Sequence, residues 1–588
     1  MTLGVAERQG DLLDEVTRHC DEAVPEGSVY ALLHRERDNL FPDGMFADLF
    51  TSTGRRSVPP SIVATVMVLQ KLGGLSDREA CERFAFDVRW RYACGLGGWD
   101  AGQRASFAHT VLVDMRARLR DSNDPKRVFR ATTDLAADAG LLGVKRALDS
   151  APLFDAVATQ DTVTLIRSAI RGLLRAAPAA LAAAIRAALV RHDDYTAAGK
   201  PPCDWDDAAA RELLVDELVG DGLAALGVVE QATTADPAVG EAAALLATVV
   251  GQDVEEGDDG VFRIARRVAR DRVISTVDPD ARHGHKTSAR RYDGYKGHVA
   301  VDPDSEIITQ TAVTPANVGD AEATQTLLAE FVAPSATTHD AAPAATTDDH
   351  DPPNNDHDPT NTGTPHADDD PAADTPDDSH DAAGDPDDGD DGAAGDGEGG
   401  GPRVYGDAAY GSGDNLEALR KMGATAMTKV APATAPGGRF SKDRFDVDLQ
   451  AGTVTCPAGQ TVGLKVAANG NGTATFGGLC ADCPLRAQCT ASPAGRSVNV
   501  GPHEALLAAA RARQADPDWQ ADYRANRPKV ERKLAHLVRR GHGGRRARVR
   551  GRQRVAQDWD WNAAAHNIAR LAMLGVRRNT TGWQAATA

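Results

Sequence analysis

Three acidic residues in distant parts of the chain could bind divalent metal ions together. They are Asp149 in Ala-Leu-Asp-Ser, Asp407 in Tyr-Gly-Asp-Ala-Ala-Tyr-Gly, and Glu531 in Arg-Pro-Lys-Val-Glu-Arg. Cleavage of a phosphodiester by two metal ions needs hard oxygen ligands that hold two Mg²⁺ ions about 3.5–4 Å apart. Carboxylates are such ligands, so together these residues predict phosphoryl transfer. Taken singly, each acid has a structural alternative as the cap of a turn, the end of a strand or an exposed helix charge.

Four of the eight cysteines fall within 34 residues and form a second candidate metal site. Cys456, Cys480, Cys483 and Cys489 are separated by 23, 2 and 5 residues, and four thiolates with one close pair suit a tetrahedral structural Zn²⁺. Between the first two cysteines, residues 462–476 predict a small β-hairpin with Asn-Gly-Asn-Gly at its tip. Eight cysteines are too few for a disulfide scaffold in so long a chain. A zinc ribbon is therefore favoured over four free thiols.

The elements around the three acids predict an α/β core. Short apolar stretches bounded by turn residues predict a hairpin over residues 292–314 and strands over residues 144–153, 403–407 and 426–430. A helix is expected from about Asp414, and a later helix carries Glu531. A central sheet could place Asp149 and Asp407 side by side, with the helix of Glu531 laid across them. This succession of elements is the layout that a two-metal nuclease core requires.

The N-terminal part of the chain, residues 1–140, has a helical pattern. Ser76-Asp-Arg-Glu79 has the form of a capping box that opens a helix. An apolar helical face follows Pro59-Pro60, and Gly73-Gly74 supplies the break between the two helices. Two helices joined in this way fit a DNA-binding helix-turn-helix and fit an ordinary helical hairpin equally well on spacing alone.

A second helical region follows the first predicted strand and extends over residues 161–270. Arg167, Arg171 and Arg175 recur every four residues on one side of its first helix. Such a stripe could follow DNA phosphates, but a charged stripe opposite an apolar face is more often solvated surface.

The net charge of -20 is concentrated in one stretch. Residues 334–401 contain 20 Asp and Glu and no Lys or Arg, which leaves 65 acidic and 65 basic residues in the remainder. The stretch is too poor in apolar residues to bury a core, so it is interpreted as a disordered insertion. By contrast, the stretch 524–554 is dense in arginine, whose guanidinium groups match phosphate oxygens, so DNA is the expected partner.

In combination, these sequences resemble those of DDE-type transposases of bacterial insertion sequences. The resemblance covers nearly the whole chain apart from the acidic stretch, and it rests on the three acids with their neighbours and on residues 41–96, 156–162, 294–298 and 314–320. It implies an RNase H-like fold in which Asp149, Asp407 and Glu531 bind two Mg²⁺ or Mn²⁺ ions. It also implies a helical N-terminal transposase domain and a cysteine-bearing insertion.

The sequence departs from the family around the glutamate. The family's signature consists of a tyrosine, an arginine, a glutamate and a lysine. Arg527 lies four residues before Glu531, as the signature requires. However, Arg524, next to Tyr523, occupies the tyrosine position, and Val538 occupies the lysine position. Arg524, Arg527 and Glu531 share one helix face, so two guanidinium groups could bind a phosphate beside the metal ions. The predicted DNA-binding residues are Arg524, Arg527, Arg539, Arg540, Arg545 and Arg546.

The expected organisation is an α/β chain with an RNase H-like mixed sheet core that carries helical, zinc-ribbon and disordered insertions. The predicted boundaries are 1–140 for the helical DNA-binding domain, 141–332 and 403–450 for the two parts of the core with its helical insertion at 161–270, 333–402 for the acidic insertion, 451–500 for the zinc ribbon, and 501–588 for the catalytic helix and basic region.

The predicted function is metal-dependent cleavage at insertion-sequence ends followed by strand transfer into target DNA. The alternatives are an RNase H-like nuclease that never joins strands and a DNA-binding remnant without catalysis. The expected partners are terminal inverted repeats and target DNA, bound by a homodimer or a higher assembly. No stretch has the character of a signal peptide or a membrane span, so a cytoplasmic, nucleoid-associated protein is expected.

Overall fold

The computed structural model describes most of the chain outside the acidic stretch. It covers residues 1–6, 15–97, 106–331, 401–539, 541 and 544–586, without the positions 156, 192, 198, 233–234, 268 and 288–289. The acidic insertion, Arg540 and Ala156, which were part of the predictions above, lie outside the described residues. Among the described helices, none has the length and apolar character that crossing a membrane requires.

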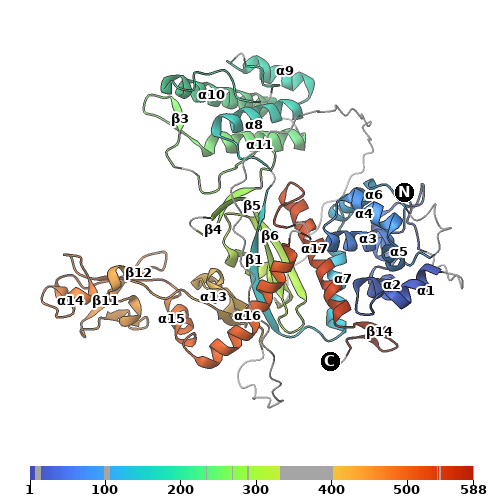
Figure 1. Ribbon diagram of the computed structural model, residues 1–588. Helices are drawn as coiled ribbons and strands as arrows, with labels where there is room; N and C mark the ends of the chain where they lie inside the picture. The colour runs from blue at the N-terminus through green and yellow to red at the C-terminus, as the bar shows by residue number, and fades with distance from the viewer. Residues whose placement is uncertain are drawn as a thin grey trace. The chain divides into compact units, whose positions relative to one another are not determined.

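A mixed sheet forms the centre of the fold, which confirms the predicted α/β class (Figure 1). Along the sheet the order is β6, β5, β1, β7, β8; the pairs β6–β5 and β5–β1 are antiparallel, whereas β1–β7 and β7–β8 are parallel. A further strand, β4, pairs with the start of β5. The strands are β1 Lys145–Phe154, β4 Arg282–Thr287, β5 Arg290–Val301, β6 Ile308–Pro315, β7 Arg403–Gly406 and β8 Thr425–Thr428.

The two faces of this sheet are covered by different helices. On one face α16 (Pro517–Leu537) and α17 (Arg552–Met573) pack over the side chains that include Ala147 and Val299. On the other face Leu148 and Ala300 belong to a cluster with α12 (Thr324–Leu327) and α13 (Gly413–Lys421). Because successive strand residues point to opposite faces, Asp149 has the parity of Ala147 and faces α16.

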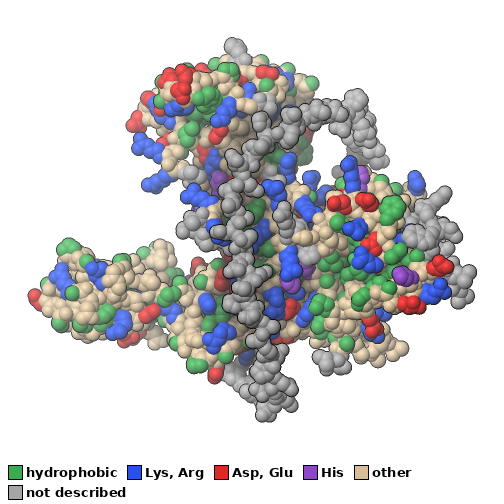
Figure 2. Space-filling model, in the orientation of Figure 1, with side chains coloured by type: hydrophobic (Ala, Val, Ile, Leu, Met, Phe, Trp, Pro, Cys, Tyr) green, Lys and Arg blue, Asp and Glu red, His purple; other side chains and the backbone are tan. Residues whose placement is uncertain are grey.

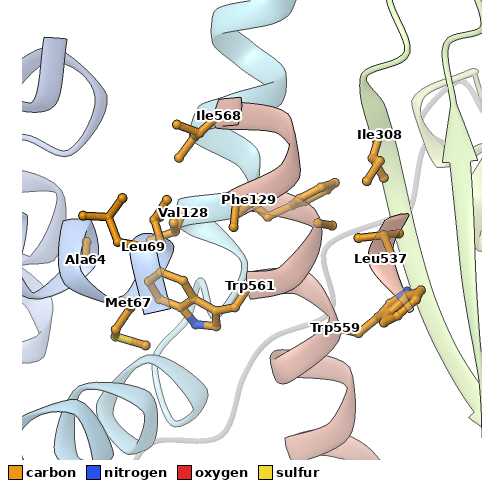
Figure 3. Close-up of a cluster of buried hydrophobic side chains, with 14 of the residues drawn as sticks. Ala64, Met67, Leu69, Val128, Phe129, Ile308, Leu537, Trp559, Trp561 and Ile568 are labelled. Carbon is orange, nitrogen blue, oxygen red and sulfur yellow. The ribbon is translucent and has the colours of Figure 1, made fainter. Parts of the chain in front are cut away.

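The N-terminal helices share their hydrophobic core with the sheet through α17. Figure 3 shows Trp561 and Ile568 of α17 beside Phe129 and Leu69 of the N-terminal helices, with Trp559 on the side of the sheet. Gly297 of β5 allows this approach, since a Cβ there would lie 2.8 Å from the Trp559 ring. The helices are α1 Glu15–Ala23, α2 Val29–Leu40, α3 Pro60–Gly73, α4 Asp77–Phe86, α5 Val88–Ala93, α6 Thr110–Arg120 and α7 Arg127–Asp138.

The capping box predicted at the start of α4 is confirmed. Ser76 Oγ accepts from the Glu79 amide, and the Glu79 carboxylate accepts from the Ser76 amide at 2.7 Å. Gly74 ends α3 in the left-handed conformation with φ of 62°, which a glycine adopts without strain.

The helical insertion after β1 has a hydrophobic core of its own. It consists of α8 Thr162–Ala176, α9 Ala179–Ala188, α10 Ala208–Ala232, α11 Pro237–Gln252 and the short pair β2 Val254–Glu256 and β3 Phe262–Ile264. The expectation of a solvated arginine stripe on α8 is wrong for Arg167. This side chain is buried and donates to the carbonyl groups of Asp194 and Gly199, because the loop after α9 folds back over it.

A small antiparallel sheet lies between β8 and the last helices. It contains β9 Asp446–Asp448, β10 Thr453–Thr455, β11 Thr461–Val466, β12 Gly472–Thr475 and β13 Ser497–Val500, and it is followed by α15 Glu504–Arg513. The predicted hairpin is present as β11 and β12, with Leu464 opposite Ala474. A last pair, β14 Arg577–Asn579 and β15 Gly582–Gln584, ends the chain.

Candidate active site

The register of the parallel pair β1–β7 brings the first two acids to the same level of the sheet. Ala147 lies opposite Tyr405, so Asp149, in the middle of β1, and Asp407, directly after the end of β7, lie at the same level of the sheet. Asp407 then caps the short helix η4 (Ala408–Tyr410), with its side chain accepting from the Ala409 amide at 2.9 Å. Asp149 is fixed in turn by the Ser150 amide, which donates to its Oδ1 at 2.8 Å.

Helix α16 carries the third acid across these two strands. Tyr523 Oη donates to the Gly406 carbonyl at 3.1 Å, and Tyr405 Oη donates to the Asp522 carboxylate at 3.0 Å. Val530 is fully buried on the same helix. These contacts fix the rotation of α16, so that Arg527 and Glu531 face the ends of β1 and β7.

The guanidinium of Arg527 lies at the centre of the three carboxylates. Its Nη2 is 3.1 Å from Asp149 Oδ2 and 3.9 Å from Asp407 Oδ2, and its Nη1 is 3.3 Å from Glu531 Oε1. The structure thus brings together the three acids that the sequence singled out. The Arg527 side chain is only 4 % exposed, whereas the exposed fractions of Asp149, Asp407 and Glu531 are 15 %, 48 % and 63 %.

Burial and neighbouring charges shift the pKa values of Asp149 and Arg527. Burial raises the pKa of Asp149 to about 6; Arg527 opposes this rise and the negative charge of Asp407 adds to it. Burial alone would lower the pKa of Arg527, but Asp149 and the other acidic groups around it raise it overall. Arg527 is therefore a permanent cation here, and the protonation of Asp149 changes near pH 6.

The three carboxylates are suitable ligands for hard cations, although in the structure they are arranged around the guanidinium group of Arg527. Carboxylate oxygens are the ligands that Mg²⁺ and Mn²⁺ prefer. Among the described residues, no three His, Cys, Asp or Glu side chains are arranged to hold a metal ion as they stand. The reason at this site is that the carboxylates surround the guanidinium of Arg527 and are not turned toward a shared point.

The four predicted zinc ligands line one small cavity beside the antiparallel sheet. Cys456 follows β10, Cys480 ends the turn η7 (Gly477–Cys480), Cys483 lies in the next turn, and Cys489 ends α14 (Arg486–Cys489). All four are free thiols. Burial raises the pKa of the Cys489 thiol, and the other three cysteines contribute to that rise. As they stand, the four described side chains are not arranged to hold a metal ion.

The predicted DNA-binding arginines fall into three groups. Arg524 and Arg539 are exposed on and just after α16, whereas Arg527 is buried among the carboxylates. Arg545 and Arg546 lie beside the carboxyl end of β1, since the Phe154 amide donates to the Arg545 carbonyl at 2.6 Å. Arg548, in the same basic stretch, has a structural role, because its guanidinium donates to the carbonyl groups of Gly74 and Leu75.

Asp320 is a fourth acid near the site that sequence reasoning did not assign. It starts the turn η2 (Asp320–Ala323), its Oδ2 accepts from Ser150 Oγ at 2.8 Å, and its Oδ1 accepts from Lys296 Nζ at 2.7 Å. The charges of Asp320, Asp149 and Asp407 all act on the buried Tyr410 and contribute to raising its pKa. In the sequence, the stretches 294–298 and 314–320 contributed only to the family resemblance. In the structure Lys296 and Asp320, one from each stretch, are hydrogen-bonded to each other.

Comparison with protein families gives three matches. Two models described as a transposase DDE domain match residues 263–342 and 455–572, and a model described as a transposase domain (DUF772) matches residues 18–118. Together they cover about half of the chain; Glu531 lies within a match, and Asp149 and Asp407 lie outside all three. Searches of curated proteins and of solved structures returned no match.

Proposed function

The chain is a DDE transposase of the insertion-sequence type, a metal-dependent phosphoryl-transfer enzyme that acts on DNA, and we propose that Asp149, Asp407 and Glu531 are its catalytic triad. The triad would bind two divalent cations, Mg²⁺ or Mn²⁺. One observation carries the proposal: acids that are more than 100 residues apart in sequence all lie within 4 Å of one guanidinium group.

The core is proposed to be RNase H-like. Three antiparallel strands followed by two parallel ones, in the order β6, β5, β1, β7, β8, support this assignment. So does the placement of Asp149 on the central strand and of Asp407 at the end of its parallel neighbour. The domain boundaries given above remain part of the proposal.

The proposed reaction has two stages, and each exchanges one P–O bond for another. Water attacks the phosphodiester at the end of the element and releases a 3'-hydroxyl; that hydroxyl then attacks target DNA and displaces an oxygen of the target strand. When bound, the ions would activate the attacking oxygen and offset the charge on the leaving one. The protein's own contribution is to hold the three carboxylates on rigid elements, with Asp149 fixed by the Ser150 amide and Glu531 by the packing of α16.

The remaining parts of the proposal concern DNA and zinc. Arg524, Arg527, Arg539, Arg540, Arg545 and Arg546 would bind DNA phosphates around the triad. The location of Arg545 and Arg546 at the carboxyl end of β1 supports this for two of them. Cys456, Cys480, Cys483 and Cys489 would bind one structural Zn²⁺, which the cavity that they share supports. Joining two element ends calls for a homodimer or a higher assembly, located in the cytoplasm on the nucleoid.

The test is a cut-and-paste assay with linear DNA that carries the element's terminal inverted repeats and a target plasmid. Wild-type protein should give joined products in Mg²⁺. Asp149→Asn, Asp407→Asn and Glu531→Gln should each lower the rate by about 1,000-fold, because losing a metal ligand removes several kcal/mol of transition-state stabilisation. Asp414→Asn, at an exposed acid on α13, is the matched control and should keep full activity.

The other outcomes of this assay separate the alternatives. Cleavage without joining would support an RNase H-like nuclease. DNA binding with neither cleavage nor joining by the wild-type protein would support a remnant without catalysis. Full activity in any of the three triad variants would overturn the assignment of that residue.

A further inference from the structure

A pocket outside the carboxylate site is lined by a cluster of cationic side chains. Its walls come from the loop 269–272, from β4, from β5 and from the turn 316–319. The cationic and imidazole groups that line it are Arg270, Arg272, Arg282, His283, His285 and Lys296. Figure 2 shows Lys and Arg side chains gathered over the part of the surface where Figure 1 labels β4.

The carboxylates that pair with these groups do not line the pocket. Asp253 pairs with Arg272, Asp271 with Arg282, Asp293 with His283 and Asp320 with Lys296, and none of the four acids belongs to the lining. Arg270 and His285 make no ion pair with any described residue. The lining of the pocket therefore presents N–H donors and positive charge to a ligand, while the compensating acids lie outside the lining.

The turn that forms one wall is tied to two other walls. Lys296 Nζ donates to the Val318 carbonyl at 2.8 Å, and Asn317 Nδ2 donates to Asp271 Oδ1 at 2.9 Å. Gly284 of β4 lies so close to the turn that a Cβ there would be 2.6 Å from the Cβ of Ala316. The loop that carries Arg270 is thus attached to the turn, and the pocket is a built feature.

The pocket is connected to the carboxylate site through β1. Asp149 lies opposite Val299 of β5 and Pro152 lies opposite Lys296, so the pocket lies three residues, about 10 Å, further toward the carboxyl end of β1. Lys296 has the strand parity of Ala300 and so belongs to the face opposite α16. A DNA strand that passes the carboxylates and continues over the end of β1 would reach it after about three nucleotides.

We propose that this pocket binds backbone phosphates of the DNA on which the carboxylates act. The inference rests on the proposed function for the identity of the DNA, and it assigns a role to the two sequence stretches, 294–298 and 314–320, that the triad does not use. Guanidinium groups bind phosphate oxygens with charge-assisted hydrogen bonds. The loop arginines belong to a basic stretch, residues 263–272, that contains five Arg and one Asp.

The test is equilibrium binding of a fluorescent 30-base-pair duplex that carries the element's end, measured without added Mg²⁺ or Mn²⁺ over a series of salt concentrations. In a plot of the logarithm of the binding constant against the logarithm of the salt concentration, Arg270→Ala should make the slope less steep by about 0.9, as expected for the loss of one phosphate contact. At 0.1 M salt the variant should bind about five- to tenfold more weakly. Arg270→Lys keeps the charge and should keep most of the slope. Because Arg270 is exposed, these variants should fold normally.

The matched control is Arg263→Ala. Arg263 precedes the loop on β3, is partly exposed and pairs with Asp259, but it does not line the pocket. An unchanged slope and affinity in Arg270→Ala, or an equal loss in Arg263→Ala, would overturn the proposal. Without Mg²⁺ or Mn²⁺ the DNA is not cut, so this readout is independent of the triad. A failed triad leaves it intact, and a failed pocket leaves the activity of the triad variants unaffected.

Discussion

Replacing Arg527 by methionine tests the arrangement at the centre of the site. Methionine has nearly the length of the arginine stem but no charge, so Arg527→Met leaves three carboxylates gathered around a vacant position. Without added Mg²⁺ or Mn²⁺, the folded variant should be less stable than the wild type, because Asp149 is mostly buried and would have no countercharge.

The magnitude follows from the exposure of the three partners. Removing one partner of a buried ion pair costs about 3–5 kcal/mol, and this applies in full only to Asp149, whose side chain is 15 % exposed. The pairs with Asp407 and Glu531 are far more exposed and each contributes about 0–1 kcal/mol. The free energy of unfolding at pH 7.5 should therefore fall by about 3–4 kcal/mol, measured by urea unfolding followed by tryptophan fluorescence.

The loss should depend on pH in a defined direction. The pKa of Asp149 is raised from 3.8 to about 6 in the folded protein, so its ionisation disfavours the folded state, and the stability that its protonated form provides is lost as pH rises through about 6. Without Arg527 this pKa rises further. The difference between wild type and Arg527→Met should therefore be largest above pH 7 and shrink as pH falls below about 6.

Mg²⁺ provides the second readout. In the wild type an ion competes with the guanidinium for the carboxylates, whereas in Arg527→Met it does not, so Mg²⁺ should stabilise the variant more than the wild type. Arg524→Met, one helix turn away at an exposed position, is the control and should change neither quantity. Equal stability of wild type and Arg527→Met without added Mg²⁺, or equal stabilisation of both by Mg²⁺, would refute the reasoning.

Three further predictions concern other parts of the molecule. Purified protein should contain one Zn²⁺ per chain by elemental analysis, and Cys483→Ser should lose it; a wild type free of zinc after growth with added zinc contradicts the proposed ligand set. Asn567→Ala should lower the free energy of unfolding by about 2–3 kcal/mol in urea, since Asn567 accepts from the Ile308 amide and donates to its carbonyl; a change under about 0.5 kcal/mol would contradict this. Mn²⁺ affinity, measured by spin resonance, should fall as pH drops below about 6, because a proton then competes for Asp149; a constant affinity between pH 5 and 7 would exclude Asp149 as a ligand.

The strands of the sheet could be predicted from the sequence because the residue patterns that indicate a strand are local. The stretch 144–153 was expected to be extended, and β1 is Lys145–Phe154; the stretch 403–407 was expected, and β7 is Arg403–Gly406. Alternation, branched side chains and flanking turn residues act within a few positions. The register of the parallel pair, with Lys145 opposite Arg403, then brings Asp149 and Asp407 to one level.

The contacts of individual arginines could not be predicted from the sequence in the same way. Arg527 was expected to bind phosphate, Arg167 to lie on a solvated stripe, and Arg548 to belong to the basic surface. In the structure all three are held by partners distant in sequence: carboxylates for Arg527, loop carbonyls for Arg167 and the α3–α4 turn for Arg548. The type and spacing of an arginine show that it can donate, but the fold decides which acceptor it meets.

Under the proposed function, Arg527 also explains how three carboxylates can be assembled before any metal ion binds. Like charges brought this close repel one another and raise each other's pKa, as the contribution of Asp407 to Asp149 illustrates. A buried guanidinium offsets that repulsion and keeps the ligands in place. The same group must give way when ions bind, and on α16 it stays one helical turn from Glu531, next to the position where a phosphate would lie. Arg527, the arginine of the family's signature, would then have two roles. It would be the counter-ion of the three carboxylates before metal ions bind, and a phosphate ligand after they have bound.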